Sequence, residues 1–322
     1  MSQSEKWTYK ALINWTTDFF RRKGVETPKL EAETLLSCAS GKSRLDLLVS
    51  YDEEPNEEVR AAFRELVKRR AAGEPNAYLV GKKEFYSLDF AVNPDVLIPR
   101  PDTELLVLET IEYFKARGWR TGVVKRRFSD DGTPPVEIET PAEPSSKGLK
   151  ICDVGVGSGC VAAALAKNIP SATLVGLDIS ASALETARRN VESLGLSARV
   201  TLLQSDLLAA IPDNLPEEER FDAIVSNPPY VSEEEYAGLD RSVREFEPRL
   251  ALVGGVTGAE LPIRLVKEAE SRLKKGGRLA LELSPTTIDA VAESMRDSGA
   301  WSSIDIRLDL EKRKRCLVAI RQ

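Results

Sequence analysis

Histidine is absent from this 322-residue sequence. Because the imidazole ring is the commonest general base and a frequent metal ligand, any catalysis must proceed without it, and we expect no metal site. Cysteine is scarce too, and its four copies show no C-x-x-C spacing: Cys38, Cys152, Cys160 and Cys316. Cysteines without such pairs are typical of free core thiols in a reducing compartment.

Long apolar runs are also missing. No stretch approaches the length of a membrane-spanning helix. The N-terminal region carries Glu5 and Asp18 and lacks the short apolar segment of a signal peptide. These absences predict a cytoplasmic protein without membrane contact.

An excess of basic residues is missing as well. The sequence holds 45 Lys and Arg against 51 Asp and Glu, which gives a formal net charge of −6. A protein that binds duplex nucleic acid usually presents a basic surface to the phosphates. The acidic balance therefore favours a protein or small-molecule partner, with RNA as the alternative.

The period of the apolar residues divides the chain. Over residues 1–80 they recur at steps of three and four, which predicts a helical domain. Over 81–101 the period shortens toward two, and a turn at Asn93-Pro94-Asp95 indicates a β-hairpin linker. Residues 102–322 form the second domain, whose first helix we expect to be capped by Asp102 or Thr103. Within it, residues 118–148 are rich in Pro, Ser and Asp and predict a flexible insertion.

Strand-like apolar runs alternate with helical patterns after residue 148. Near-continuous apolar strands separated by helices are typical of an α/β fold with a doubly wound, mostly parallel sheet. Two last runs, at 303–308 and 316–320, predict an antiparallel edge. The five earlier strands are expected at 149–153, 173–178, 199–204, 221–226 and 278–283, with helices at 182–194 and 260–273.

A glycine-rich segment, Asp153-Val154-Gly155-Val156-Gly157-Ser158-Gly159, follows the first of these strands. Glycines allow a sharp turn and a close approach of the backbone to a ligand. In open α/β sheets, ligands bind at the carboxyl ends of the strands, where this turn would lie. Its G-x-G-x-G spacing differs from the G-x-G-x-x-G of dinucleotide sites, and a glycine-rich packing turn is the alternative.

Two acidic residues follow the next two strands. Asp178 is placed to accept hydrogen bonds from both hydroxyls of a ribose, which NAD and S-adenosylmethionine both carry. Asp206 is placed to accept from an adenine amino group, and a helix N-cap is the alternative for this residue. The two positions predict a nucleoside ligand without identifying it.

The segment Asn227-Pro228-Pro229-Tyr230 follows the strand at 221–226. Proline fixes φ and has no N–H, so two prolines predict a rigid corner with outward carbonyls. The Asn227 side-chain oxygen and the Pro228 carbonyl can then accept both hydrogens of one NH2 group. Tyr230 offers a flat face for stacking. An ordinary strand-ending turn is the alternative.

Together these segments predict methyl transfer to nitrogen. The lone pair of an amide or aryl amine is delocalised, and accepting both N–H bonds from one side favours pyramidalisation toward a sulfonium methyl. Alignment contributes up to roughly 7–11 kcal/mol, and the oriented acceptors stabilise the developing charge. The sequence therefore predicts an S-adenosylmethionine-dependent methyltransferase acting on a planar amide or an exocyclic amine.

At this point the chain resembles the peptide chain release factor glutamine methyltransferases. The most specific shared string is Leu97-Ile98-Pro99-Arg100-Pro101-Asp102-Thr103-Glu104, and the likeness spans nearly the whole chain apart from 118–148. The chain departs from the family at Glu282-Leu283-Ser284-Pro285, where the family has a Glu-Ile-Gly type of sequence. The other shared segments are the glycine-rich segment, Asn227-Pro228-Pro229-Tyr230, Glu245-Phe246-Glu247-Pro248, Gly73-Glu74-Pro75 and Glu84-Phe85-Tyr86.

The resemblance implies a Rossmann-like, seven-stranded methyltransferase domain preceded by a small helical bundle and a hairpin linker. It implies that the side-chain amide nitrogen of the glutamine in the Gly-Gly-Gln motif of class 1, bacterial-type release factors is methylated. The helical domain and the hairpin would bind the surface of the release factor, and a nucleic acid partner is not expected.

The resemblance also implies roles for single residues. Arg100 and Glu104 would bind the substrate or support its loop. Asn227, Pro228 and Tyr230 would be catalytic, and together with Pro229 they would bind the glutamine. S-adenosyl-L-methionine would be held by Asp153, Gly155, Val156, Gly157, Ser158, Gly159, Asp178, Asp206, Leu207 and Asn227.

Three other functions stay open at this stage. A methyltransferase acting on an exocyclic amine of a nucleic acid base uses a similar Asn-Pro-Pro-aromatic turn and would need a flipped or single-stranded base. A catalytically silent protein that binds release factors is the second alternative. An NAD-dependent dehydrogenase is the third, and the glycine spacing disfavours it.

Overall fold

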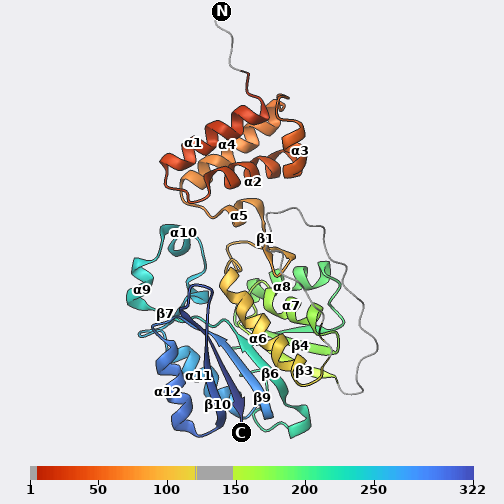
Figure 1. Ribbon diagram of the computed structural model, residues 1–322, viewed down its shortest axis with the longest axis vertical. Coiled ribbons are helices and arrows are strands. Elements are labelled where there is room, and N and C mark those ends of the chain that lie inside the picture. The colour runs from red at the N-terminus through yellow and green to blue at the C-terminus, as the bar shows by residue number, and fades with distance from the viewer. Residues whose placement is uncertain (1–5, 120, 122–147) are drawn as a thin grey trace, which may run out of the picture. The chain divides into compact units, whose positions relative to one another are not determined.

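The computed structural model describes residues 6–119, 121 and 148–322 (Figure 1). Apart from its ends, the insertion predicted at 118–148 lies outside the described residues. The chain forms two compact units. One combines the residues up to Lys82 with Asp240–Phe246, and the other combines Lys83–Leu239 with Glu247–Gln322. The sequence patterns gave no sign that a segment so far along the chain joins the helical unit.

The first unit is helical, as the spacing of its apolar residues indicates. Thr8 caps its first helix by accepting from Ala11 N, and Pro28 occupies the first turn of the second. Phe20, Leu35 and Phe63 lie at the centre of its core. The helices are α1 (Tyr9–Arg22), α2 (Pro28–Ser40), α3 (Arg44–Val49), α4 (Glu57–Ala71), α5 (Asn76–Val80) and α10 (Arg241–Arg244). Three short helices, α3, α5 and α10, were not predicted, because four to six residues carry too little periodicity.

The β-hairpin is present, but its turn is not where the sequence placed it. Strands β1 (Lys82–Phe85) and β2 (Leu88–Ala91) are joined by Tyr86 and Ser87, whose φ angles are 51° and 60°. Two central residues with positive φ make the two-residue turn that matches strand twist. Residues 96–98, which follow the turn that the sequence indicated at Asn93-Pro94-Asp95, form no strand. Neither Tyr nor Ser is a usual residue for this conformation, which is why the turn was missed.

Seven strands form the main sheet of the second unit, in the order β10-β11-β9-β6-β3-β4-β5. Strand β11 runs antiparallel to both of its neighbours, and the other pairs are parallel. The predicted Rossmann-like α/β fold is confirmed. The strands are β3 (Leu149–Val154), β4 (Ala172–Asp178), β5 (Val200–Gln204), β6 (Phe221–Ser226), β9 (Leu273–Glu282), β10 (Trp301–Leu308) and β11 (Lys314–Arg321).

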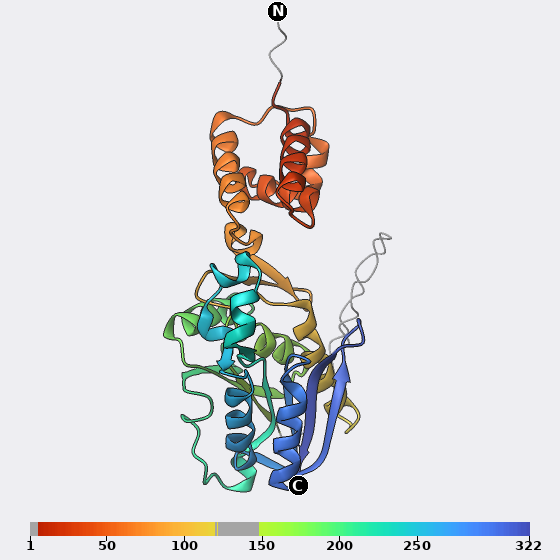
Figure 2. The same ribbon diagram turned by 90° about the vertical axis from the view of Figure 1, so that its left-hand side faces the viewer.

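Helices cover both faces of this sheet (Figures 1 and 2). Successive residues of β3 point to opposite faces, so that Ile151 packs in one apolar cluster and Cys152 in the other. The first face is covered by α6 (Glu104–Lys115), α7 (Cys160–Asn168) and α8 (Ala181–Ser193). The second is covered by α11 (Glu260–Glu270) and α12 (Ile288–Ser298).

The expected cap of α6 is wrong. A short 3-10 helix, η1 (Pro101–Thr103), leads directly into α6, and Thr103 itself has helical angles. Its side chain therefore makes no cap hydrogen bond. The buried Thr103 hydroxyl takes part in a different contact, described below.

Strand β3 lies between β4 and β6, so the chain leaves it in one direction and later returns on its other side. Ligands of open α/β sheets bind beyond the carboxyl ends of the strands at such a switch point. Several short elements lie after β5 and β6. They are η2 (Glu217–Glu219), β7 (Val231–Ser232), α9 (Glu233–Gly238), η3 (Arg249–Ala251) and β8 (Val253–Gly255).

Candidate functional site

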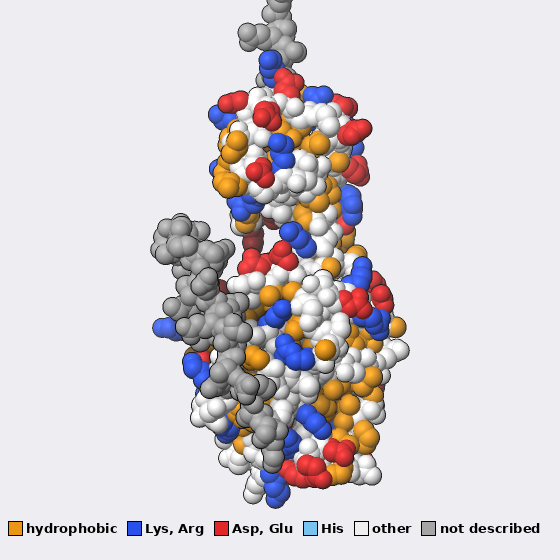
Figure 3. Space-filling view, turned by 90° about the vertical axis from the view of Figure 1, so that its right-hand side faces the viewer, with side chains coloured by type: hydrophobic (Ala, Val, Ile, Leu, Met, Phe, Trp, Pro, Cys, Tyr) orange, Lys and Arg blue, Asp and Glu red, His pale blue; other side chains and the backbone are white. Residues whose placement is uncertain are grey.

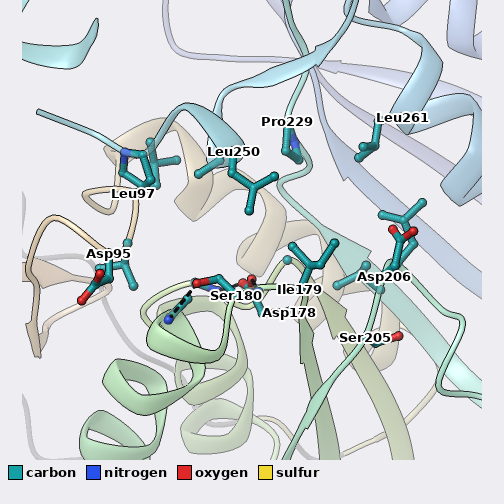
Figure 4. A pocket seen from close by; sticks show the side chains of 18 residues that line it. Asp95, Leu97, Asp178, Ile179, Ser180, Ser205, Asp206, Pro229, Leu250 and Leu261 are labelled. Atoms are coloured by element: carbon teal, nitrogen blue, oxygen red, sulfur yellow. Dashed lines mark hydrogen bonds between the residues drawn. The ribbon is translucent and has the colours of Figure 1, made fainter. Parts of the chain in front are cut away.

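A pocket opens at the carboxyl ends of the parallel strands (Figure 4). Asp178 and Ile179 line one side, and Leu250 and Pro229 face them from the other. Of the predicted site residues, six line this pocket: Gly155, Gly157, Asp178, Asp206, Leu207 and Pro229. The sequence did not predict that this pocket is also lined by Asp95, Leu97, Ile179, Leu250 and Leu261. Apolar or loop residues far apart in the chain carry no local signal of a shared site.

The glycine-rich segment forms a tight turn between β3 and α7. Gly155, Gly157 and Gly159 have φ angles of 73°, 52° and 82°, a region that residues with a Cβ rarely adopt. The backbone N–H groups of Gly155 and Val156 both donate to Leu177 O, at 2.8 and 2.9 Å. The turn is thus fixed to the end of β4, and two of its glycines present bare backbone to the pocket.

Asp178 is the last residue of β4, and its carboxylate is hydrogen-bonded to the glycine turn. Its Oδ2 accepts from Gly157 N at 2.9 Å, and its Oδ1 accepts from Ser180 N at 2.9 Å. Burial raises the pKa of the Asp178 carboxyl, and the backbone N–H groups of Ser180 and Gly157 oppose that shift. Each carboxylate oxygen can accept a second hydrogen bond, so both remain able to meet hydroxyl groups in the pocket.

Asp153 lies beneath the turn, outside the pocket lining. It is buried, and its Oδ2 accepts from Ala162 N in the first turn of α7 at 2.9 Å. Burial raises the pKa of Asp153 to about 8. Val156 and Ser158 are buried too, and the Ser158 carbonyl accepts from Asn190 Nδ2 at 2.8 Å. The structure therefore gives these three residues contacts that support the turn.

Asp206 lies at the far side of the pocket (Figure 4) and forms an ion pair with Arg264. No helix starts directly after Asp206, so the alternative of a helix N-cap is wrong. The next residue, Leu207, is nearly buried and has a φ angle of 47°. A bulky residue in this left-handed region is strained, and such residues concentrate at functional sites.

The corner Asn227-Pro228-Pro229-Tyr230 adjoins the glycine turn. A Cβ placed on Gly155 would lie 3.8 Å from Asn227 O. The side-chain Nδ2 of Asn227 donates to Thr103 Oγ1 at 3.1 Å, which leaves its Oδ1 as the free acceptor of that amide. Since β3 and β6 are parallel neighbours, the two segments that follow them lie at the same edge of the sheet.

Two glycines press against the carbonyls of the corner. A Cβ on Gly254 would lie 2.3 Å from Pro229 O, and one on Gly258 would lie 2.2 Å from Tyr230 O. Real Cβ atoms do not approach so closely, so neither position accommodates a side chain without movement of the corner. The pairing of β7 with β8 and these two glycines fix the backbone that follows Pro228.

Glu282 ends β9 directly behind the corner and is 2% exposed. The hydroxyl of Tyr230 donates to Glu282 Oε1 at 3.3 Å. Burial raises the pKa of Glu282 to about 7, while the hydrogen bond from the Thr103 side chain and the charge of Arg315 lower it. Burial, followed by the charge of Glu282, raises the pKa of Tyr230, so its phenol stays protonated.

Arg100 and Glu104 support neighbouring segments. Arg100 forms an ion pair with the buried Glu247, whose Oε2 also accepts from Ile98 N at 3.1 Å. Glu104 Oε1 accepts from Tyr86 N in the hairpin turn at 3.1 Å. Neither lines the pocket. Their contacts fix the loop before α6 and the hairpin, and a direct contact with a substrate stays a prediction.

Behind the corner, sequence reasoning also missed Thr103 and Glu282. Thr103 was assigned to a helix cap, and Glu282 was noted only as part of a departure from the family. A signal was available for Glu282, because an acidic residue inside a strand that is otherwise apolar is expected to be paired or functional.

A groove lies on the helical unit by itself. It is lined by Trp15 and Phe19 of α1 and by Arg60 and Arg64 of α4, among others. Trp15 is 49% exposed, and its ring stacks on Phe19 with the centroids 5.2 Å apart. Exposed aromatic and arginine side chains are typical of protein interfaces. Figure 3 shows acidic and basic side chains interspersed on one face of the described surface.

No helix of the described residues is long and apolar enough to cross a membrane. The same residues hold no group of three or more His, Cys, Asp or Glu side chains placed to bind a metal ion.

Comparisons with known proteins agree with this geometry. Residues 11–81 match a family model described as the PrmC N-terminal domain, and residues 145–308 match a methyltransferase domain model. A release factor glutamine methyltransferase of Rhodopirellula baltica is 44% identical over 316 residues, which are 98% of this chain and 97% of that protein. One from Geobacter sulfurreducens is 41% identical over 279 residues, or 87% and 85% of the two chains.

Solved structures show the same fold. The hMettl16 catalytic domain, solved in complex with MAT2A 3′UTR hairpin 6, superposes with a TM-score of 0.50 at 15% identity. The match covers 80% of this chain and 82% of that one. At this identity the likeness is one of fold alone.

Proposed function

The chain belongs to the release factor glutamine methyltransferase family, and from that premise we propose its reaction and substrate. The protein is a methyltransferase. The methyl group comes from S-adenosyl-L-methionine. The acceptor is the side-chain amide nitrogen of the glutamine in the Gly-Gly-Gln motif of class 1, bacterial-type release factors. The reaction then takes place in the cytoplasm, where translation ends.

The pocket at the carboxyl edge of the sheet fits this cofactor. Gly155 and Gly157 expose backbone that a Cβ would cover, and the Asp178 carboxylate has two oxygens with free lone pairs for ribose hydroxyls. Ile179 and Leu261 provide an apolar surface for the adenine ring, with Asp206 and Leu207 near its amino group. When bound, S-adenosylmethionine supplies a methyl group on a positively charged sulfur.

Residues of the proline corner hold the glutamine amide. Asn227 Oδ1 and the Pro228 carbonyl accept its two N–H hydrogens and direct the nitrogen lone pair toward the pocket. The Tyr230 ring, held by its hydroxyl on Glu282, packs against the amide plane. Alignment of the nitrogen supplies most of the rate, and the two acceptors stabilise the positive charge that develops there. The proton leaves to water after transfer.

The groove on the helical unit binds the folded body of the release factor. Its aromatic rings provide contact area, while Arg60, Arg64 and Lys68 match acidic side chains on the partner. Binding at a distance from the glutamine raises the local concentration of the Gly-Gly-Gln loop at the pocket. Asp153, Val156, Ser158, Arg100 and Glu104 act as supports of this arrangement.

The glycine turn and the proline corner adjoin each other, and Gly155 of the first and Pro229 of the second both line the pocket; this observation carries the proposal. The test is to incubate the purified protein, S-adenosylmethionine and a folded bacterial-type release factor, and to digest the product. We expect the peptide with the Gly-Gly-Gln glutamine to gain the mass of one methylene unit. A factor whose glutamine is replaced serves as the control. An unchanged peptide in the intact factor would refute the substrate.

A further inference from the structure

Helix α11 contacts the pocket segment that follows β5. Leu261 on this helix lines the pocket together with Asp206 and Leu207 of that segment (Figure 4). Arg264 and Glu268 follow on the same helix, three and seven positions after Leu261. Residues at this spacing lie on one face of a helix. The face of α11 that reaches the pocket therefore also carries a cation and a carboxylate.

Both charged residues bind the pocket segment. Arg264 forms an ion pair with Asp206, and its Nε lies 3.2 Å from Glu268 Oε1. The other oxygen, Glu268 Oε2, accepts from Leu208 N at 3.0 Å. Asp206 and Leu208 flank Leu207, whose φ angle of 47° is unfavourable for a bulky residue. The contacts from α11 thus hold both neighbours of a strained residue that lines the pocket.

The backbone of this segment is also tied to the neighbouring strand. Ser205 N donates to Asp178 O at 2.9 Å, and Ala210 N donates to Ser205 Oγ at 3.0 Å. The main chain on both sides of Asp206 is therefore fixed. The Asp206 side chain is 53% exposed, and its orientation depends on the ion pair with Arg264.

The Arg264 guanidinium occupies one oxygen of the Asp206 carboxylate. Arg264 Nη2 donates to Asp206 Oδ1, which leaves Oδ2 as the acceptor for a ligand. Without that contact an exposed aspartate would rotate about its side-chain torsions, and a ligand would have to order it on binding. The ion pair supplies this order before the ligand arrives.

We propose that Arg264 is a positioning residue for the Asp206 carboxylate and thereby makes the pocket select adenine over a 6-oxo purine. This inference rests on the proposed function, because it concerns the base of S-adenosylmethionine. The amino group of adenine donates to the fixed carboxylate oxygen. A 6-oxo purine presents a carbonyl oxygen at the same place, and two acceptors cannot form a hydrogen bond. Because the ion pair holds Asp206, its carboxylate cannot turn aside to avoid that repulsion.

Calorimetric titration of the full chain with two nucleosides tests the proposal. S-adenosylhomocysteine carries adenine, and S-inosylhomocysteine carries an oxygen in place of the amino group. We expect the wild type to bind the adenine compound at least about tenfold more tightly, because the other compound loses a hydrogen bond to a charged acceptor. Arg264→Met keeps a long side chain without donors, and we expect it to lower this ratio of Kd values at least about threefold. An unchanged or higher ratio would overturn the proposal.

A double variant shows whether Arg264 acts through Asp206. In Asp206→Ala the carboxylate is gone, so Arg264→Met added to it should leave the ratio as it is. A further fall in the double variant would mean that Arg264 contacts the base itself, which would overturn its positioning role. If Arg264→Met does not fold, Glu268→Gln replaces it, since it weakens the hold on Arg264 and keeps an oxygen for Leu208 N. We expect a lower ratio there too, and an unchanged one would overturn the proposal.

Lys267→Met is the matched control. Lys267 is exposed on the same helix and does not line the pocket. Lys267→Met should keep the wild-type ratio, and an equal fall in both methionine variants would overturn the proposal, because the loss of any positive charge on α11 would then suffice. A wild type that binds neither nucleoside would refute the proposed cofactor. Full selectivity in Arg264→Met would refute this inference and leave the proposed function intact.

Discussion

The side-chain nitrogen of Asn227 donates to the hydroxyl of Thr103, although 124 positions separate the two residues. The contact joins the proline corner after β6 to the short helix that begins at Pro101. It consumes the donor end of the Asn227 amide and leaves the acceptor end for a ligand. Thr103, which the sequence analysis assigned to a helix cap, thus holds the Asn227 amide, which we propose binds the substrate.

Removing the Asn227 amide should abolish most transfer. Asn227→Ala leaves the substrate amide with one acceptor, and we expect kcat to fall about 10²-fold or more, the size of effect seen when one oriented group is lost from a charge-stabilising site. Single-turnover methylation of the release factor measures it. Asn214→Ala, at an exposed loop position, is the control and should behave as the wild type. Full activity in Asn227→Ala would contradict the mechanism.

Adding one methyl group behind the corner should also lower activity. In Gly254→Ala the new Cβ would lie 2.3 Å from Pro229 O, so the corner must shift. We expect kcat to fall at least about tenfold and thermal stability to drop, since overpacking costs about 1–3 kcal/mol. Activity assays and thermal melts check this.

Gly238→Ala is the matched control for that substitution. No atom lies within 4 Å of a Cβ at Gly238, and the residue ends α9 with an ordinary φ angle. It should match the wild type in both measurements. If Gly254→Ala and Gly238→Ala had the same kcat and thermal stability, the corner could shift without loss of either.

Local patterns were enough to predict the sheet. The apolar run at 221–226 coincides with β6, and the run at 173–178 is β4 without its first residue. Both are short buried strands whose composition leaves few alternatives. The glycine turn was predictable for a similar reason, because three alternate glycines after a strand favour positive φ angles. These features depend on neighbours in the sequence.

Contacts between distant segments were not predictable from the sequence. Glu282 and Tyr230 are 52 positions apart, and no periodicity connects them. The hairpin turn was misplaced because Tyr86 and Ser87 adopt positive φ without glycine or asparagine. Asp153 was assigned to the cofactor from its motif, which gave no sign that it is buried and accepts from Ala162 N. Tertiary packing decides each of these cases.

Asp178 should control the affinity for S-adenosylmethionine. Asp178→Asn keeps the size of the side chain but replaces one carboxylate oxygen with a donor that cannot accept from a ribose hydroxyl or from Gly157 N. Because hydrogen bonds to charged groups contribute about 1.5–3 kcal/mol, we expect a Kd that is about 10- to 100-fold higher. Calorimetric titration measures it. Asp289→Asn, an exposed ion-pair partner of Lys314, is the control, and an equal loss in both would contradict the role of Asp178.

Trp15 should affect the binding of the release factor and not the chemistry. Trp15→Ala removes an aromatic ring that lines the groove on the helical unit and is about half exposed. We expect KM for the release factor to rise about tenfold, with kcat at saturation and the Kd of S-adenosylmethionine unchanged. Steady-state kinetics on intact factor check this. Leu45→Ala removes an exposed apolar side chain of α3 outside the groove, and it should leave KM as it is.

Asp153 should make stability depend on pH in the unusual direction for a carboxyl group. Its pKa is about 8 in the folded protein and roughly 4 in an unfolded chain, so between these values the folded state binds more protons. The contribution of Asp153 to stability is therefore fully present at about pH 4 and is lost as the pH rises to about 8. Asp153→Asn keeps an oxygen for Ala162 N and cannot ionise. Its Tm should exceed that of the wild type by about 2–4 °C or more at pH 8, and by much less at pH 5. A difference in Tm that stays constant between these two pH values would show that Asp153 is ionised in the folded protein.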